Sequence, residues 1–174
     1  PVLDPRIDAL IKPLKQDLEA SGWPADADLH GKPGLRHLGL RVGVGTGELL
    51  ITLVSATTEL NGAKDLALEW MSRWPAVAGV TLNLQPRRSN TVLGAITHTL
   101  AGRDCISERF CDLQLLLKTT TFFQINTARA EQIVIVLRDW LLKRGDCKRF
   151  IDAYCGIGTI SLPIAATGIS VVGL

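Results

Sequence analysis

A seven-residue segment, D-A-Y-C-G-I-G at residues 152–158, constrains the fold of this chain more than any other feature. Phe150 and Ile151 precede it, and the apolar run T-I-S-L-P-I-A-A follows it. This pattern predicts a strand, a glycine loop and a helix, and the apolar residues 169–174 predict a second strand. In a parallel sheet such a loop exposes backbone N–H groups at the carboxyl edge, backed by the dipole of the helix, where cofactors bind.

The spacing within this loop separates classes of cofactor. The dinucleotide fingerprint G-x-G-x-x-G needs a glycine where this chain has Ser161, which disfavours a nicotinamide-binding module. The pattern D-x-x-x-G-x-G fits S-adenosylmethionine better. The strand at 169–174 lacks the acidic residue that grips ribose hydroxyls in such folds. Because the chain also begins with Pro1 rather than Met, we expect it to be a piece of a longer enzyme.

Composition places the chain among ordinary globular proteins, with 47% hydrophobic and 21% charged residues in 174. A net charge of +2 means that any nucleic-acid contact depends on a local patch. No apolar run reaches the roughly 20 residues of a membrane span and no charged-then-apolar leader opens the chain, so we expect a cytoplasmic protein without a membrane partner. No obligate protein partner is evident from the sequence. The four cysteines lack metal-ligand spacing, which predicts reduced thiols and no metal site: Cys105, Cys111, Cys147 and Cys155.

The hydrophobic pattern divides the chain into two domains, residues 1–118 and 119–174. Helical spacing predicts helices over residues 3–20 and 63–74. Strands are predicted at 38–42, 49–54, 77–85, 91–93, 96–100 and 112–117, and G-V-G-T-G at 43–47 is expected to be a hairpin turn rather than a phosphate loop. The fold class is therefore α/β: a central α+β domain followed by the first βαβ unit of a truncated Rossmann-like domain.

The second domain opens with F-F-Q-I-N at residues 122–126, and a helix with an apolar stripe follows. Asn126 or Thr127 can cap this helix, and Gly145 ends it. Its stripe is expected to cover the sheet that starts at Phe150, and it consists of Ala130, Ile133, Val134, Leu137, Trp140 and Leu141.

F-F-Q-I-N, this helix and D-A-Y-C-G-I-G, in that order, resemble the RNA uracil-5 methyltransferases of the RumA/TrmA type. Three upstream segments also look like the central domain of that family: L-R-H-L-G-L-R, V-T-L-N-L-Q-P-R-R-S-N-T-V-L-G and L-A-G-R-D. The likeness covers nearly the whole chain. It implies S-adenosylmethionine-dependent synthesis of 5-methyluridine in structured RNA, with 23S ribosomal RNA favoured over transfer RNA.

The resemblance also implies a set of cofactor-binding residues. They are Gln124, Tyr154, Gly156 and Thr159, with Asp152 orienting the loop from behind. The chemistry agrees, because the Gln124 amide is both donor and acceptor, the Tyr154 ring can stack on the cofactor, and glycine allows close backbone approach. For Gln124 a solvated amide, and for Tyr154 simple packing, are the competing interpretations.

No catalytic residue is expected in this chain. In the family a cysteine thiolate attacks C6 of uracil and a base removes the C5 proton, and both groups would lie beyond Leu174. Cys155 lies inside the cofactor loop, and we interpret it as structural. The 174 residues alone are therefore expected to be inactive. Many members carry an iron–sulfur cluster on cysteines just before a P-V-L-like segment, so a cluster is conceivable in a longer protein but not on this chain's cysteines.

Asn83, Arg87, Arg88 and Asn90 are candidates for RNA contact, since proteins read single-stranded RNA loops specifically. A solvated basic turn is the simpler interpretation. Two other functions also stay open. One is an S-adenosylmethionine enzyme with a small-molecule or protein substrate, and the other is a non-catalytic RNA-binding protein with a vestigial cofactor loop.

Overall fold

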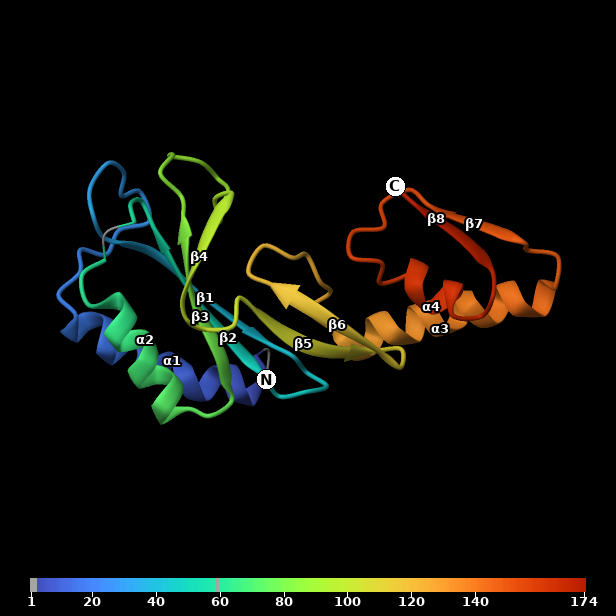
Figure 1. Ribbon diagram of the computed structural model, residues 1–174, viewed down its shortest axis with the longest axis horizontal. Helices are drawn as coiled ribbons and strands as arrows, with labels where there is room; N and C mark the ends of the chain where they lie inside the picture. The colour runs from blue at the N-terminus through green and yellow to red at the C-terminus, as the bar shows by residue number, and fades with distance from the viewer. Residues whose placement is uncertain (1–2, 59) are drawn as a thin grey trace. The chain divides into compact units, whose positions relative to one another are not determined.

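A computed structural model describes residues 3–58 and 60–174 of the protein (Figure 1). Pro1 and Val2, which belong to the P-V-L segment of the iron–sulfur argument, lie outside the described residues. The predicted α/β fold class is confirmed. In chain order the elements are α1 (Pro5–Ala20), β1 (Leu35–Val42), β2 (Leu49–Ser55), α2 (Ala63–Arg73), β3 (Val77–Leu84), β4 (Ile96–Gly102), β5 (Cys105–Phe110), β6 (Leu113–Lys118), α3 (Thr127–Arg144), β7 (Arg149–Asp152), α4 (Ser161–Ala165) and β8 (Ser170–Gly173).

The N-terminal unit, residues 1–107 and 116–120, is built on a four-stranded sheet in the order β1-β2-β3-β4. The β1–β2 and β3–β4 pairs are antiparallel, whereas β2 and β3 run parallel and α2 connects them. The antiparallel β1–β2 pair confirms that residues 43–47 form a hairpin turn, with Gly47 at φ +82°. Positive φ explains the glycine at this position.

The two faces of this sheet differ in chemistry. One face packs Ile51, Leu53 and Val80 against α1 and α2, and Trp70 of α2 is fully buried there. The indole N–H of Trp70 donates to Asp17 Oδ2 at 2.8 Å, which satisfies the one polar atom of this ring. The opposite face carries polar as well as apolar side chains, among them Thr52, Thr81 and Leu50.

Residues 86–95 do not include the strand predicted at 91–93, so that expectation is wrong. The Gln85 amide nitrogen donates to the carbonyls of Thr91 and Leu93, at 2.9 and 3.2 Å. These carbonyls are therefore satisfied by a side chain and not by a neighbouring strand. Conversely, the strand β5 was not predicted from the sequence.

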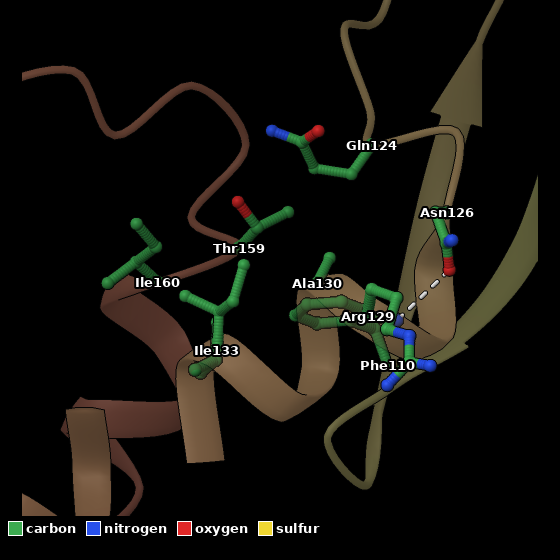
Figure 2. Close-up of a pocket in the computed structure, with 9 residues that line it drawn as sticks. Phe110, Gln124, Asn126, Arg129, Ala130, Ile133, Thr159 and Ile160 are labelled. Carbon is green, nitrogen blue, oxygen red and sulfur yellow. Dashed lines mark hydrogen bonds between the residues drawn. The ribbon is translucent and has the colours of Figure 1, made fainter. Parts of the chain in front are cut away.

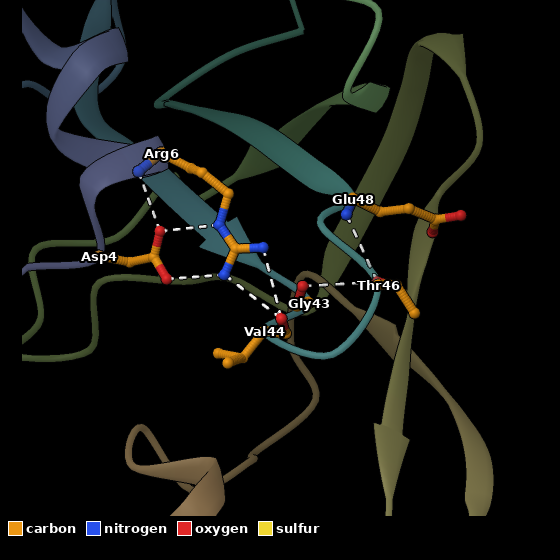
Figure 3. A network of polar contacts seen from close by, with 6 residues as sticks. All are labelled: Asp4, Arg6, Gly43, Val44, Thr46 and Glu48. Carbon is orange, nitrogen blue, oxygen red and sulfur yellow. Dashed lines mark hydrogen bonds and ion pairs between the residues drawn. The ribbon is translucent and has the colours of Figure 1, made fainter.

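The N-terminus of α1 is tied to the β1–β2 turn by charged groups (Figure 3). Asp4 caps the helix by accepting from the Arg6 backbone N–H at 2.9 Å, and the Arg6 guanidinium donates to the same carboxylate. The guanidinium also reaches the Val44 carbonyl of the turn at 3.3 Å. The hydrogen bond from Arg6 lowers the pKa of Asp4 from 3.8 to about 2.

The C-terminal unit contains residues 108–115 and 121–174. Asn126 caps α3, accepting from the Arg129 N–H at 3.1 Å, and Gly145 ends the helix with φ +71°. β7 and β8 pair in parallel on either side of α4, which confirms the predicted βαβ order. Helix α4 is shorter than the apolar run at 159–166 from which it was predicted. The apolar stripe of α3 is only partly covered, since Val134 is buried while Ile133 is 68% exposed.

We predict that Asp4→Asn lowers the free energy of unfolding near neutral pH by about 1 kcal/mol, because the variant loses the ion pair and weakens the cap. A lowered folded-state pKa gives stability above the unfolded value, and this stability disappears as pH falls from about 3.8 towards 2. Urea unfolding as a function of pH measures both effects. Lys12→Ala is the control. If the free energy of unfolding fell equally with decreasing pH in Asp4→Asn and in the parent, the assignment would be contradicted.

Candidate functional site

The glycine loop at residues 153–160 is held at both ends by Asp152. The Ser161 hydroxyl donates to the Asp152 carboxylate at 2.6 Å, and the Tyr154 backbone N–H lies 3.3 Å from the other carboxylate oxygen. Ser161 is buried, and the Asp152 carbonyl accepts from the Leu174 N–H at 2.9 Å. The serine that replaces the third glycine of the dinucleotide fingerprint therefore fastens α4 to the end of β7.

Two glycines of the loop adopt conformations that other residues rarely adopt. Gly156 has φ +52° with open space around the missing side chain, and Gly158 has φ +88°. A Cβ on Gly158 would lie 2.8 Å from the Leu162 side chain, so a larger residue would push against α4. The loop is thus kept close to the helix, while Gly156 leaves the backbone accessible from outside.

The thiol of Cys155 faces the end of β8. The Cys155 backbone N–H donates to the Leu174 carbonyl at 3.2 Å, and a Cβ on Gly173 would lie only 2.8 Å from the Cys155 sulfur. This placement agrees with the structural interpretation of Cys155. Elsewhere, burial raises the pKa of the thiols of Cys105 and Cys111, and the nearby Asp104 and Glu131 carboxylates add to the respective shifts, which makes both poor nucleophiles at neutral pH.

A pocket of about 220 Å³ lies within the C-terminal unit, between the start of α3 and the loop before α4 (Figure 2). Figure 2 shows the Gln124 amide and the Thr159 hydroxyl at the same side of this space, above Ala130 and Ile133 of α3. The lining residues are Phe110, Gln124, Asn126, Arg129, Ala130, Ile133, Val134, Thr159 and Ile160. A few polar groups over an apolar floor are typical of a small-molecule site.

The structure brings together two of the four predicted cofactor residues. Gln124 and Thr159 line the pocket, although 35 positions separate them in the sequence. Tyr154 and Gly156 do not line it, and the Tyr154 side chain is 96% exposed. Sequence reasoning missed the floor formed by Ala130 and Ile133, because their helical spacing indicates core packing and gives no separate signal for a pocket.

The four RNA-contact candidates lie in different surroundings. Asn83 is completely buried, and its side-chain amide forms hydrogen bonds with the backbone of Gly94. This side chain is therefore not presented to a ligand. Arg87, Arg88 and Asn90 are exposed on the loop that follows β3. Within residues 3–58 and 60–174, no three potential metal ligands come together and no helix is long and apolar enough to cross a membrane.

No protein-family model matches the chain. It is 60% identical over all 174 residues to an uncharacterized RNA methyltransferase of Parasynechococcus marenigrum, and 44% identical over 174 residues to one of Thermosynechococcus vestitus. The chain is homologous to RNA methyltransferases. It spans 37% and 38% of the length of these two relatives. The resemblance to RNA methyltransferases, inferred from F-F-Q-I-N and the glycine loop, is thereby confirmed.

The fold is also that of a solved methyltransferase. The Pyrococcus abyssi tRNA (uracil-54, C5)-methyltransferase in complex with S-adenosyl-L-homocysteine matches 94% of this chain and 38% of its own chain, with a TM-score of 0.73 and 23% identity. At this level of identity the match establishes the fold alone.

We predict that Ser161→Ala loosens the glycine loop, because it removes a short hydrogen bond to a carboxylate worth about 1.5–3 kcal/mol. Hydrogen exchange followed by mass spectrometry should show faster exchange in peptides covering residues 153–165. Ser170→Ala, on the exposed start of β8, is the matched control. Unchanged exchange in Ser161→Ala would mean that this bond does not hold the loop.

Proposed function

We propose that this chain carries part of the S-adenosylmethionine site of an RNA uracil-5 methyltransferase. The observation that carries the proposal is the convergence of Gln124, from F-F-Q-I-N, and Thr159, from the glycine loop, on one pocket. Both motifs were expected to bind the cofactor, and the pocket joins them without any residue outside the C-terminal unit.

The residues of the site suit different parts of such a cofactor. The Gln124 amide can both donate and accept, and the Thr159 hydroxyl can do the same, which suits a ribose or an amino-acid group. Ala130 and Ile133 offer an apolar floor for a ring, and the exposed Tyr154 ring is free to stack. A pocket of about 220 Å³ is smaller than a typical ligand site of roughly 300–1,000 Å³, so it accommodates one portion of the cofactor.

The substrate in this proposal is RNA, and the product is 5-methyluridine. S-adenosylmethionine supplies an electrophilic methyl group, while this chain orients the cofactor and fixes the glycine loop through Asp152 and Ser161. We place the nucleophilic cysteine and the base in residues outside 1–174, as the resemblance to the family implies, and the Cys155 thiol faces β8. A domain boundary near residue 118 and a cytoplasmic location belong to the same proposal.

Transfer of labelled methyl groups to RNA tests the reaction. With the full-length protein, 23S ribosomal RNA transcripts should accept label at a uridine C5, and transfer RNA transcripts should accept less. Label on proteins or small molecules instead would favour the S-adenosylmethionine enzyme of another substrate class. RNA binding without any transfer would favour a vestigial cofactor loop.

Gln124→Ala and Tyr154→Ala should each weaken S-adenosylmethionine binding by about tenfold, the cost of one hydrogen bond or one ring contact. Isothermal titration calorimetry of the full-length protein measures this. Ile125→Ala is the matched control, because Ile125 neighbours Gln124, is 97% exposed and does not line the pocket. Parental affinity in both variants, with the control unchanged, would refute the cofactor site.

Cys155→Ser should leave methyl transfer largely intact, because the thiol faces β8 and plays no part in the chemistry. RNA containing 5-fluorouridine traps the attacking cysteine covalently, and mass spectrometry of the adduct identifies it. A crosslink on Cys155 would overturn the structural interpretation of this residue.

A further inference from the structure

The second face of the N-terminal sheet buries a group of hydroxyl side chains. Thr52 and Thr81 lie opposite each other on β2 and β3, and the Thr119 hydroxyl lies 3.1 and 2.9 Å from theirs. All three threonines are less than 8% exposed. A buried hydroxyl face needs hydrogen-bond partners and a cover, and within this unit Thr119 and the loop at residues 86–95 contribute to both.

The loop at residues 86–95 is fixed by side chains beneath it. The buried Arg36 guanidinium donates to the carbonyls of Gln85 and Arg87, at 2.5 and 2.8 Å. The Asn83 side chain accepts from the Gly94 N–H at 2.7 Å and donates back to the Gly94 carbonyl at 3.0 Å. Together with the Gln85 bonds described above, these contacts turn four loop carbonyls inward, and Arg87 and Arg88 are left exposed on a fixed backbone.

A second pocket, of about 250 Å³, lies under this loop and entirely within the N-terminal unit. Gly39, a residue without a side chain, forms part of its lining on β1. Its full lining is Gly39, Leu40, Arg41, Leu50, Thr52, Val92, Leu93 and Thr119. Apolar walls with a guanidinium and hydroxyl groups suit a flat, polar-edged ring, and the volume is below that of a typical drug-sized site.

The charge of the stretch that carries the loop also favours a nucleic acid. Between Glu69 and Asp104 the sequence contains no acidic residue, and this stretch includes β3, the loop and the edge strand β4. Arg87 and Arg88 are exposed, and their own stretch contributes no carboxylate. Asp26 and Asp28 belong to another segment, on either side of Ala27, whose carbonyl accepts from the same Arg36 guanidinium as the Arg87 carbonyl. A single nucleic-acid strand alternates negative phosphates with flat bases. Arginines and a ring-sized pocket on one loop can bind these two groups respectively.

We propose that the loop at residues 86–95 and the pocket beneath it bind single-stranded RNA, with Arg87 and Arg88 on phosphates and one unpaired base in the pocket. Arg36, Asn83 and Gln85 are positioning residues that hold the loop in this arrangement. The inference rests on the proposed function only in that RNA is the substrate. It adds a base-binding site in the N-terminal unit, and none of its lining residues lines the cofactor pocket of the C-terminal unit.

Gly39→Val tests the pocket. A Cβ on Gly39 would meet Thr52 at an ordinary contact distance of 3.4 Å, and β-branched residues favour strands, so the variant should fold while its methyl groups fill the pocket. Fluorescence anisotropy of the full-length protein with labelled oligouridylate should give about tenfold weaker binding, the cost of one lost base contact. The slope of log affinity against log salt should not change, because no phosphate contact is lost.

Arg87→Ala combined with Arg88→Ala tests the phosphate contacts. This double variant should lower the magnitude of the salt slope by about 1.4, or roughly 0.7 for each phosphate contact of a single strand. Lys12→Ala combined with Lys64→Ala is the matched control, since it removes the same charge from the helices on the opposite face of the sheet. An equal change in slope for both pairs would mean that the arginines act only through the net charge of the protein, and it would overturn the proposal.

Oligouridylate with abasic positions completes the test. If the pocket takes a base, the parent should lose affinity for the abasic strand, and Gly39→Val should lose little more. Val92→Ala, at an exposed part of the wall, gives an independent variant that should weaken binding several-fold. Parental binding by folded Gly39→Val and by Val92→Ala would refute the pocket while leaving the methyltransferase proposal intact. A parent protein that binds no RNA would refute both.

Discussion

Burial of β2 on both faces is the constraint on which the N-terminal unit depends. All seven residues of this strand are buried, so each face of the sheet must be covered by other parts of the chain. On one face the helices α1 and α2 bury apolar side chains and need only match their shape. On the other face Thr52 needs hydrogen-bonding partners, which Thr81 and Thr119 supply. Covering a polar face requires specific partners and therefore fixes the chain above it more narrowly than an apolar face does.

In the C-terminal unit, too, specific hydrogen bonds fix the position of a segment. Its βαβ unit has a helix of only five residues, too short to be stable by itself. The bond from Ser161 to Asp152 connects the helix to the strand before it, and the Leu162 N–H donates to the Gly158 carbonyl of the loop at 2.9 Å. The predicted role of the helix dipole is correspondingly small. We attribute the polarity of the candidate cofactor pocket to the side chains of Gln124 and Thr159 instead.

Much of the fold could be predicted from local patterns in the sequence. The Asn126 cap, the Gly145 stop and the parallel β7–β8 pair all follow from signals within a few residues of each element. The loop at residues 86–95 could not be predicted in this way, because β-branched Thr91 and Val92 favour a strand and the amides that prevent one come from Gln85 and Asn83. The burial of Asn83 was missed for the same reason: strand position indicates a face, but not what covers that face.

The candidate site divides along the same line. Gln124 and Thr159 were found through motifs, whereas Ala130, Ile133 and the pocket at Gly39 have no sequence signature, because a pocket is defined by the absence of atoms between segments distant in the chain. The buried side-chain amides of Asn83 and Gln85 lie in a recognisable sequence motif, but their role depends on contacts that the motif does not reveal. Asn83 and Gln85 lie in the segment that resembles the family's central domain, yet their side chains form hydrogen bonds within the chain, whereas Arg87 and Arg88 are exposed to the solvent. A loop whose backbone is already fixed loses less conformational entropy on binding a flexible strand, so inward-facing residues can contribute to RNA affinity without touching the RNA.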